Sequence, residues 1–541
     1  MPDRSADLVF MGARVEPIAA APRPADAVAV RDGRIVAVGA AADVRRHIGR
    51  RTRVLELNGE TLLPGFGDSH IHPIGGGMLA DQCDLHDLPD AAAYREAIAR
   101  YAATHPDRAW IQGAGWSITA FPRGEPGREL LDQLVGDRPA ILESNDGHNA
   151  WASSRALAIA GITAATDDPA DGRIARDEHG EPNGTLVDGA ISLVTDHLPP
   201  PRHEELLAGL RAAQAHLHAL GITAWQDAHV EPADMAAYRE AAAAGWLTAR
   251  VVAALWWERD AGPEQIDAFE GLRAAGTVGR LRADSVKLML DGVIESRTAW
   301  LTSPYLDAGD DRGVPFLEPS LLRRAVVELD RRGFQAHFHA IGDAAVRLAL
   351  DAVEEARRAN GPSDVRHHAS HLELIHPDDV TRFAPLDVTA NIQPFWAVDD
   401  QQMQDFRIPA LGVDRLDWQF VFGSLRRAGA RLAGGSDWTV TTANPLLEME
   451  VAVSRVAPDA RESAPFLPGE ALTMDEALTA FTIGSAFVNH LDHETGTIEV
   501  GKRADLVLLD RDIRAADAGP LGEATVTATW VEGDLVFSAA R

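Results

Sequence analysis

The 541-residue sequence is short of cysteine, of basic residues and of long apolar runs. Its single cysteine, Cys83, excludes an intrachain disulfide framework and a cysteine-based zinc site, and we expect an unreactive, half-buried thiol. Lys and Arg number 51 against 81 Asp and Glu, a net charge of −30. This acidic balance argues against nucleic acid or an anionic membrane as a partner, because either would require a basic surface.

No stretch of about 18 apolar residues exists, so we expect no membrane-spanning helix. Residues Met1–Phe10 lack the apolar segment that a signal peptide needs, which leaves the cytoplasm as the expected location. What is present is ordinary for a globular protein: 46% of the residues are hydrophobic and 24% are charged. The length predicts two to four domains.

Strand-like and helix-like patterns alternate through the middle of the chain. Short apolar runs predict eight strands, at residues 65–72, 222–226, 250–254, 285–290, 334–339, 365–371, 388–393 and 431–435. Helical patterns occur at about 204–220, 234–245, 263–276, 318–332, 341–359, 415–428 and 473–487. Strict alternation predicts a parallel sheet and eight units predict closure, so the expected fold class is α/β, a TIM-like (β/α)8 barrel.

Two further regions accompany the barrel, which is expected to comprise residues 63–84 and 204–487. Short β patterns at both ends of the chain predict a small β-sandwich built from residues 1–62 and 488–541. The segment 85–203 separates the first two barrel strands and is far too long for one βα connection. It predicts an inserted α+β subdomain over the barrel mouth.

The sharpest motif is the segment Pro64–Pro73 (PGFGDSHIHP), which places a His-x-His pair at the end of the first expected strand. Because residues i and i+2 of a strand face the same side, His70 and His72 should point together toward the barrel axis. Two converging imidazoles suit a borderline metal such as zinc. A bare His-x-His pair is equally compatible with a core, so its position at a strand end carries the argument.

Four other polar residues occupy equivalent positions. Lys287 lies inside the apolar fourth strand, where a cation is costly unless it is neutralised, modified or turned outward. His339, His371 and Asp437 end or follow the fifth, sixth and eighth strands. Each alone is more often a cap or a core residue, but together with the His-x-His pair they form a candidate set of metal ligands.

The chain resembles the amidohydrolase superfamily, and within it the YtcJ-like group of amidohydrolase family 3, which includes N-substituted formamide deformylases. The resemblance covers nearly the whole chain. It rests on the motifs Leu63–His72, Asp146–Trp151 (DGHNAW), Val286–Gly292 (VKLMLDG), Arg297–Ala299, His339–Asp343 (HAIGD), Gln393–Pro394, Gly435–Asp437 and Gly501–Leu506 (GKRADL).

The resemblance implies two divalent metals, with zinc favoured and manganese, iron or cobalt as alternatives. One metal would be held by His70, His72 and Asp437, and the other by His339 and His371. Lys287, N6-carboxylated by carbon dioxide, would bridge the two metals as a carbamate.

The sixth strand departs from the family pattern. Relatives often carry Glu-His there, whereas this chain has Ser370-His371. The histidine is kept, so the departure changes a hydrogen bond behind the metal, and such contacts matter for metal affinity.

The implied function is hydrolysis of a C–N bond in a small molecule, in an amide, an N-formyl group or a cyclic amide, by metal-activated hydroxide. Asp437 would take and return the proton, while His371 or His339 would help to polarise the carbonyl. Three alternatives stay open: ester or carbamate hydrolysis, deamination, and a catalytically silent scaffold. The family analogy favours a homodimer.

Candidate substrate-binding residues lie outside the metal set: His148, Trp116, Arg297, Gln393 and Trp396. Arg297 could bind a substrate carboxylate or a surface acid. We expect His337 one layer below His339 on the same side of its strand, and expect His367 and His368 to be structural or solvent-exposed.

Overall fold

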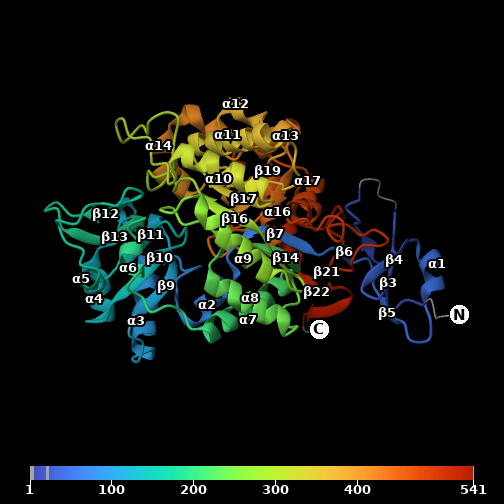
Figure 1. The fold of residues 1–541 in the computed structure, drawn as a ribbon. Coiled ribbons are helices and arrows are strands. Elements are labelled where there is room, and N and C mark those ends of the chain that lie inside the picture. Colours follow the sequence, from blue (N-terminus) through green and yellow to red (C-terminus); the bar gives the residue numbers. More distant parts are fainter. Residues whose placement is uncertain (1–4, 20–23, 540–541) are drawn as a thin grey trace.

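The computed structural model describes residues 5–19 and 24–539. Residues 1–4, which begin the segment expected to contain no signal peptide, lie outside this description. Within the described residues the strands form four sheets of four, six, eight and five strands. Figure 1 shows the eight-stranded barrel between the strands near the N-terminus on one side and the insertion on the other.

The central sheet confirms the expected α/β barrel. Its neighbouring strands are parallel, and each expected strand is present. In chain order they are β7 (Phe66–Ile71), β14 (Ile222–Val230), β15 (Arg250–Trp256), β16 (Leu281–Met289), β17 (Gln335–Ala340), β18 (His368–His371), β19 (Thr389–Ile392) and β20 (Leu432–Gly434).

Helices cover the outside of this sheet, as Figure 1 shows. The helices of the barrel region, including short ones in its loops, are α2 (Pro73–Met78), α7 (His203–Ala219), α8 (Pro232–Ala243), α9 (Ile266–Gly276), α10 (Pro319–Arg331), α11 (Asp343–Asn360), α12 (Pro377–Val380), α13 (Phe383–Leu386), α14 (Ile408–Leu411), α15 (Phe422–Arg427), α16 (Pro445–Ser454), α17 (Met474–Thr479) and α18 (Ser485–Val488). The strands therefore lie between a packed interior and a helical layer, which explains their apolar sequences.

One expected helix of the barrel was wrong, and one long helix was not expected. The pattern at 415–428 does not form one helix, because Phe420 adopts a left-handed φ of 47° between a 3-10 turn at Val413–Trp418 and α15. Conversely, α16 was not anticipated. Its buried residues include acidic Glu448 and Glu450 beside Leu446 and Met449, so its sequence lacks the one-sided apolar stripe that marks a surface helix.

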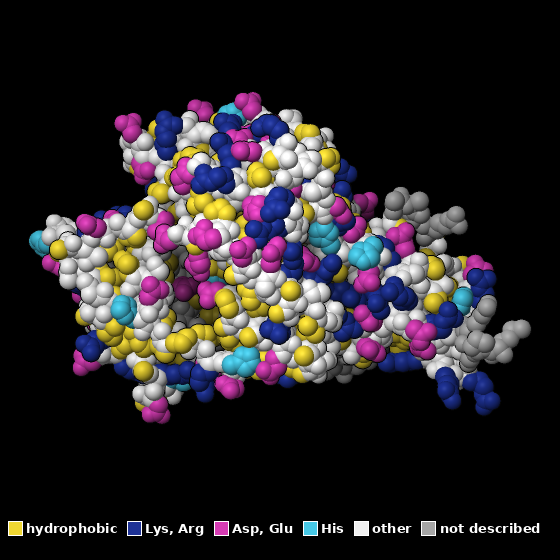
Figure 2. Space-filling view, in the orientation of Figure 1, with side chains coloured by type: hydrophobic (Ala, Val, Ile, Leu, Met, Phe, Trp, Pro, Cys, Tyr) yellow, Lys and Arg dark blue, Asp and Glu magenta, His cyan; other side chains and the backbone are white. Residues whose placement is uncertain are grey.

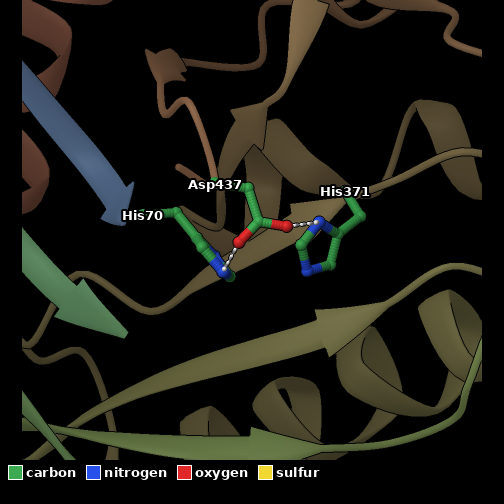
Figure 3. A group of neighbouring side chains, drawn as sticks. All are labelled: His70, His371 and Asp437. Carbon is green, nitrogen blue, oxygen red and sulfur yellow. Dashed lines mark ion pairs between the residues drawn. The ribbon is translucent and has the colours of Figure 1, made fainter. Parts of the chain in front are cut away.

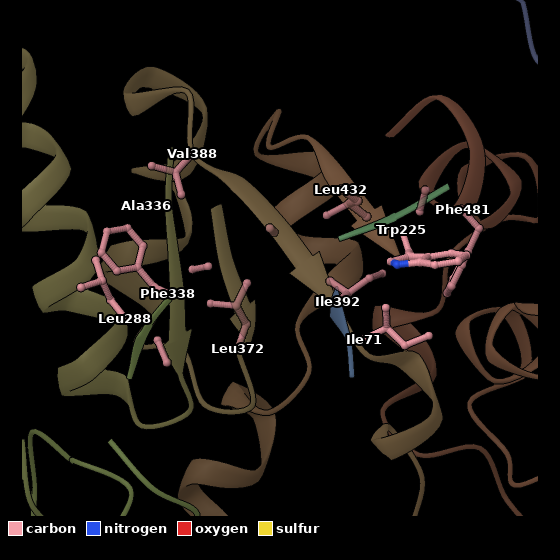
Figure 4. Packing of buried hydrophobic residues seen from close by; sticks show 14 of the residues in the cluster. Ile71, Trp225, Leu288, Ala336, Phe338, Leu372, Val388, Ile392, Leu432 and Phe481 are labelled. Atoms are coloured by element: carbon pink, nitrogen blue, oxygen red, sulfur yellow. The ribbon is translucent and has the colours of Figure 1, made fainter. Parts of the chain in front are cut away.

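The barrel core is built from large side chains that pack between strands and helices. Figure 4 shows Trp225, Ile392, Leu432 and Phe481 among these buried residues. A Cβ at Gly434 of β20 would lie 2.6 Å from the Phe481 ring. Glycine at this position therefore lets the ring lie directly against the strand.

The ring of strands closes through a seam rather than a regular ladder. Strands β7 and β20 stand at the two ends of the sheet order. Beyond their last residues, the amide of Asp437 donates to the carbonyl of His70 (2.8 Å) and the amide of His72 to the carbonyl of Trp438 (3.0 Å). The Asp68 carboxylate also accepts from the amide of Ser436 at 3.1 Å.

The two ends of the chain form two sheets that share a buried cluster. One sheet holds β1 (Leu8–Met11), β3 (Ala27–Arg31), β4 (Arg34–Gly39) and β5 (Arg53–Glu56), with α1 (Ala41–Val44) beside it. The other holds β2 (Arg14–Val15), β6 (Thr61–Pro64), β21 (Leu506–Leu509), β22 (Val526–Val531) and β23 (Asp534–Ser538). Phe10 and Trp530 meet edge to face at 4.9 Å between them.

The long segment after β7 forms its own six-stranded sheet with helices. Its elements are β8 (Cys83–Asp84), α3 (Ala91–Thr104), β9 (Ile111–Trp116), α4 (Arg128–Val135), β10 (Ala140–Ser144), β11 (Asn149–Ala152), α5 (Ser154–Ile159), β12 (Gly172–Arg176), β13 (Pro182–Asp188) and α6 (Ser192–Thr195). Cys83 is fully buried here rather than half-buried, and burial raises the pKa of its thiol to about 12. Among the described helices, none has the length and apolar character to cross a membrane.

Candidate metal centre

Three side chains from distant parts of the barrel converge at the carboxyl end of its strands. His70 lies near the end of β7, His371 ends β18, and Asp437 follows β20; Figure 3 shows them turned toward one another. One ligand atom from each lies within 4.8 Å of the others. Nε2 of His70 is 3.1 Å from Asp437 Oδ1, and Nδ1 of His371 is 3.9 Å from Asp437 Oδ2.

The structure brings the other three candidate ligands to the same place. Nε2 of His72 also lies 3.1 Å from Asp437 Oδ1. The Lys287 ammonium is buried and its Nζ lies 3.2 Å from His70 Nε2. The His339 ring is 4.4 Å from the His371 ring. Side chains from β7, β16, β17, β18 and the end of β20 therefore surround one point.

This donor set fits a divalent cation. Among the described residues, Asp437 Oδ1 and both ring nitrogens of His371 are buried and accept or donate no hydrogen bond, although buried polar atoms are normally satisfied. The 3.1 Å separations between Asp437 and the two histidines resemble those between two ligands of one tetrahedral zinc, about 3.3 Å. Lys287 has no carboxylate oxygen within 4.0 Å among the described residues, so no ion pair offsets its burial.

Electrostatics favour the ligand forms of these groups. Burial, assisted by the Lys287 cation, lowers the pKa of His70 to about 3. Burial also lowers the pKa of Lys287 to about 7, although Asp437 opposes the shift. Burial alone would raise the pKa of Asp437, but His70, His72 and His371 hold it well below its usual value. Neutral imidazoles and an ionised carboxylate are the states in which these side chains bind metal.

The backbone presents two of these residues in unusual conformations. His371 has φ of 75° and Asp437 has φ of 56°, a region that residues other than glycine rarely occupy. Each is held by a hydrogen bond: the His371 amide donates to Gln393 Oε1 at 2.7 Å, and the Asp437 amide donates to the His70 carbonyl. Gln393 is thus buried beside His371, where its amide oxygen holds the main chain of that residue.

The comparison with known families decides the classification. The chain matches the model of the amidohydrolase family across residues 53–537. It belongs to the amidohydrolase family. The resemblance drawn from the motifs is thereby confirmed.

Relatives extend over almost the whole amidohydrolase chain. It is 30% identical over 519 residues to YtcJ of Bacillus subtilis, which is named an amidohydrolase, covering 95% of this chain and 96% of that protein. It is 29% identical over 562 residues to the N-substituted formamide deformylase of Arthrobacter pascens, with 98% of each covered. The crystal structure of an uncharacterized metal-dependent hydrolase from Pyrococcus furiosus superposes with a TM-score of 0.72 at 26% identity, covering 93% of this chain and 99% of that one.

Behind the converging ligands of the amidohydrolase lies a second layer of polar groups. Nε2 of His337 is 2.9 Å from His70 Nδ1 and 3.0 Å from Ser370 Oγ. If Nε2 of His70 binds metal, its Nδ1 carries the proton and donates to His337. Asp68, which accepts from the amide of His70 at 3.1 Å, ties the same strand to the seam.

The two remaining histidines of the sixth strand are both fully buried. Of the two expected alternatives, solvent exposure is therefore excluded. Nε2 of His367 contacts Asp330 Oδ2 of α10 at 3.1 Å, which is a structural contact between strand and helix. His368 points into the barrel, where its Nε2 lies 2.8 Å from Gln226 Oε1.

The candidate substrate-binding residues are distributed unevenly around the centre. Trp396 stacks on the His371 ring at 5.2 Å. Nδ1 of His148 is 2.6 Å from Asp188 Oδ1, and its ring is 5.5 Å from the His339 ring. Burial alone would lower the pKa of His148, but Asp188 and other carboxylates raise it to about 9.

Two other candidates do not face an open pocket. The Trp116 side chain is fully buried in the core of the insertion, and its Nε1 donates to the carbonyl of Leu142 at 2.7 Å. Arg297 donates to the Asp307 carboxylate and to the carbonyls of Ile294 and Glu295. Its guanidinium is engaged within its own loop, which matches the surface-acid alternative.

A buried ion cluster that joins three loops at the mouth was not predicted from the sequence. Arg407 pairs with Glu295, and its Nη2 lies 3.1 Å from Glu373 Oε2. These residues follow β19, β16 and β18, respectively. Charged residues in loops ordinarily face solvent, so their sequence carries no signal of burial. Asp291, by contrast, belongs to the motif Val286–Gly292. Its carboxylate accepts from the amides of Ile341 and Gly342 at 3.0 and 2.8 Å.

Proposed function

We propose that the protein is a metal-dependent hydrolase that cleaves a C–N bond in a small molecule: an amide, an N-formyl group or a cyclic amide. The convergence of His70, His371 and Asp437, with buried ligand atoms left unpaired, carries this proposal. Membership of the amidohydrolase family and near full-length similarity to an N-substituted formamide deformylase support the reaction class.

We further propose two divalent cations, zinc foremost. The residues that would hold them are His70, His72 and Asp437 for one, His339 and His371 for the other, and carboxylated Lys287 between them. A bound cation supplies Lewis acidity, which lowers the pKa of a bound water to about 7 and polarises a carbonyl. Carboxylation of Lys287 joins its amine nitrogen to the carbon of carbon dioxide and releases a proton. This replaces a buried cation without an ion-pair partner by an anion that suits the surrounding ligands.

The protein's own groups then handle the proton. Asp437 accepts it from the attacking water at a carboxylate oxygen and returns it to the leaving nitrogen. Its amide hydrogen bond to the His70 carbonyl fixes the main chain, and its carboxylate lies 3.1 Å from the imidazoles of His70 and His72. Trp396, stacked on His371, covers that ring on one side and limits the access of solvent.

Metal analysis and a substrate panel test this proposal together. The protein, expressed with added zinc, is assayed for metal content and for turnover of N-formyl, N-acyl and cyclic amides, with matched esters in parallel. We expect near two equivalents of metal and release of amine from at least one amide. Turnover confined to esters, or release of ammonia from an amino-substituted ring, would overturn the C–N amide assignment. Metal-free protein after loading would support a silent scaffold.

A further inference from the structure

We propose that His148 is a catalytic residue delivered by the insertion: held by Asp188, its Nε2 donates a hydrogen bond to the carbonyl oxygen of the substrate. This inference rests on the proposed function and adds to it a group that is not a metal ligand. It assigns the inserted subdomain a part in the reaction beyond covering the barrel.

The first observation is how rigidly the ring is held. The His148 amide donates to Asp146 Oδ1 at 3.0 Å, and its carbonyl accepts from the amide of Asp188 at 3.0 Å. The side chains of the same two residues meet again, with Nδ1 of His148 2.6 Å from Asp188 Oδ1. Both the main chain and the ring of His148 are therefore fixed before any substrate binds.

The second observation is the nitrogen that remains. Because Nδ1 faces Asp188, its proton stays there, and Nε2 is the atom left for another partner. No described residue forms a hydrogen bond with Nε2, and the side chain is 13% exposed, so this nitrogen is open to a ligand. A carboxylate at 2.6 Å stabilises the imidazolium, in which Nε2 is a donor.

The third observation is where the ring lies. It lies 5.5 Å from the ring of His339, which in turn lies 4.4 Å from that of His371. Figure 2 shows the surface hollowed between the insertion and the barrel. A carbonyl bound beside the metal ligands would thus have His148 at its side, where a preorganised donor stabilises the charge that develops on oxygen.

The contact between the insertion and the barrel is built for close approach. A Cβ at Gly292, in the loop after β16, would lie 2.7 Å from Asp188 Oδ2 and 2.2 Å from Thr298 Oγ1. Only glycine leaves room for Asp188 at this distance. Nearby, Asn149 Nδ2 donates to Ser296 Oγ of the same loop at 3.1 Å. These contacts fix the distance between His148 and the barrel.

Replacement of His148 tests the inference on metal-loaded protein. For H148A we expect kcat to fall about 100-fold, as for the loss of one oxyanion donor, with KM changed less than about threefold. H148Q, whose amide nitrogen can still donate, should recover at least a tenth of the wild-type kcat.

The matched control is H203Q. His203 also pairs with a carboxylate, Glu240, at 2.7 Å, but on the exposed surface between α7 and α8. Metal content, thermal midpoint and turnover should match the wild type. Loss of metal in H148A would mean that the residue supports the metal site instead, which overturns the inference.

Formate binding gives a readout that does not depend on turnover. Calorimetric titration of the metal-loaded protein with formate should show at least tenfold weaker binding in H148A than in the wild type or H203Q. Equal kcat and equal formate affinity in H148A and wild type would overturn the inference. Weaker formate binding in H148A, from a wild type that hydrolyses no amide, would overturn the proposed reaction while keeping the role of His148 as a donor.

Discussion

The barrel buries one polar cluster at each end of its strands, around Arg250 and around Asp437, and the two clusters differ in how their atoms are paired. At the start of β15, Arg250 donates to Asp505 Oδ2 at 2.7 Å and to Glu532 Oε1 at 2.8 Å, both from the terminal sheets. At the opposite end, Asp437 Oδ1 and the nitrogens of His371 form no hydrogen bond with any residue that the structure describes. The paired cluster joins two parts of the fold, whereas the unpaired atoms keep bonding capacity for a ligand. The unpaired ligand atoms, rather than buried charge itself, therefore distinguish the cluster around Asp437 from the cluster around Arg250.

The strongest test of the cluster around Asp437 is the variant D437N. This change keeps the shape of the side chain but removes its basicity, so kcat should fall by about three orders of magnitude or more. Metal analysis should show that most of the metal is retained. A variant that turns over at the wild-type rate would show that Asp437 is not the proton acceptor.

A smaller effect is expected behind the ligands. H337L removes the acceptor for His70 Nδ1, so zinc affinity should fall about 10–100-fold in a competition titration with a chromogenic chelator. S370A leaves that acceptor in place and frees it from its second contact, so its affinity should stay within about threefold of wild type. Equal losses in both variants would show that Ser370, rather than His337, orients His70.

A change in the cluster around Arg250 should lower the stability of the protein instead of its activity. D505N leaves the buried Arg250 guanidinium without its main carboxylate, at a cost of about 3 kcal/mol. For a chain of this length, that corresponds to a fall in thermal midpoint of about 3 °C by calorimetry. Specific activity at 25 °C should be unchanged. A loss of metal in D505N would show that the two clusters are not independent.

The smallest expected effect is a pH-dependent change in the thermal midpoint. Burial alone would raise the pKa of Glu532, but hydrogen bonds from Arg280 and Arg250 lower it from 4.5 to about 2. A carboxyl group with a depressed folded-state pKa contributes stability above pH 4.5, and this is lost as the pH falls toward 2. E532Q should therefore lower the thermal midpoint above pH 4.5 by about 1–2 °C and converge on the wild type near pH 2. A constant difference at every pH would exclude titration as its cause.

The eight strands were predictable because each is an apolar run bounded by turn residues, and the ligands because each lies in the second half of such a run or directly after it. His70, Lys287 and Asp437 needed only strand direction to be placed near one another. Partners that come from distant sequence were not predictable. Nothing near Arg407 points to Glu295 or Glu373, and nothing near His148 points to Asp188. The break at Phe420 depends on one backbone angle, which no side-chain pattern specifies.

The barrel closes at the seam between β7 and β20 through a few hydrogen bonds instead of a regular ladder. His70 and Asp437 sit on its two sides, joined by one backbone hydrogen bond and both directed at the same point. A cation bound by both residues would form a second link across that seam. Loading of the metal and closure of the ring are then one equilibrium, so the amides on either side of the opening should exchange with deuterium more slowly in the loaded protein. The catalytic centre would thus also stabilise the closure of the barrel in which it lies.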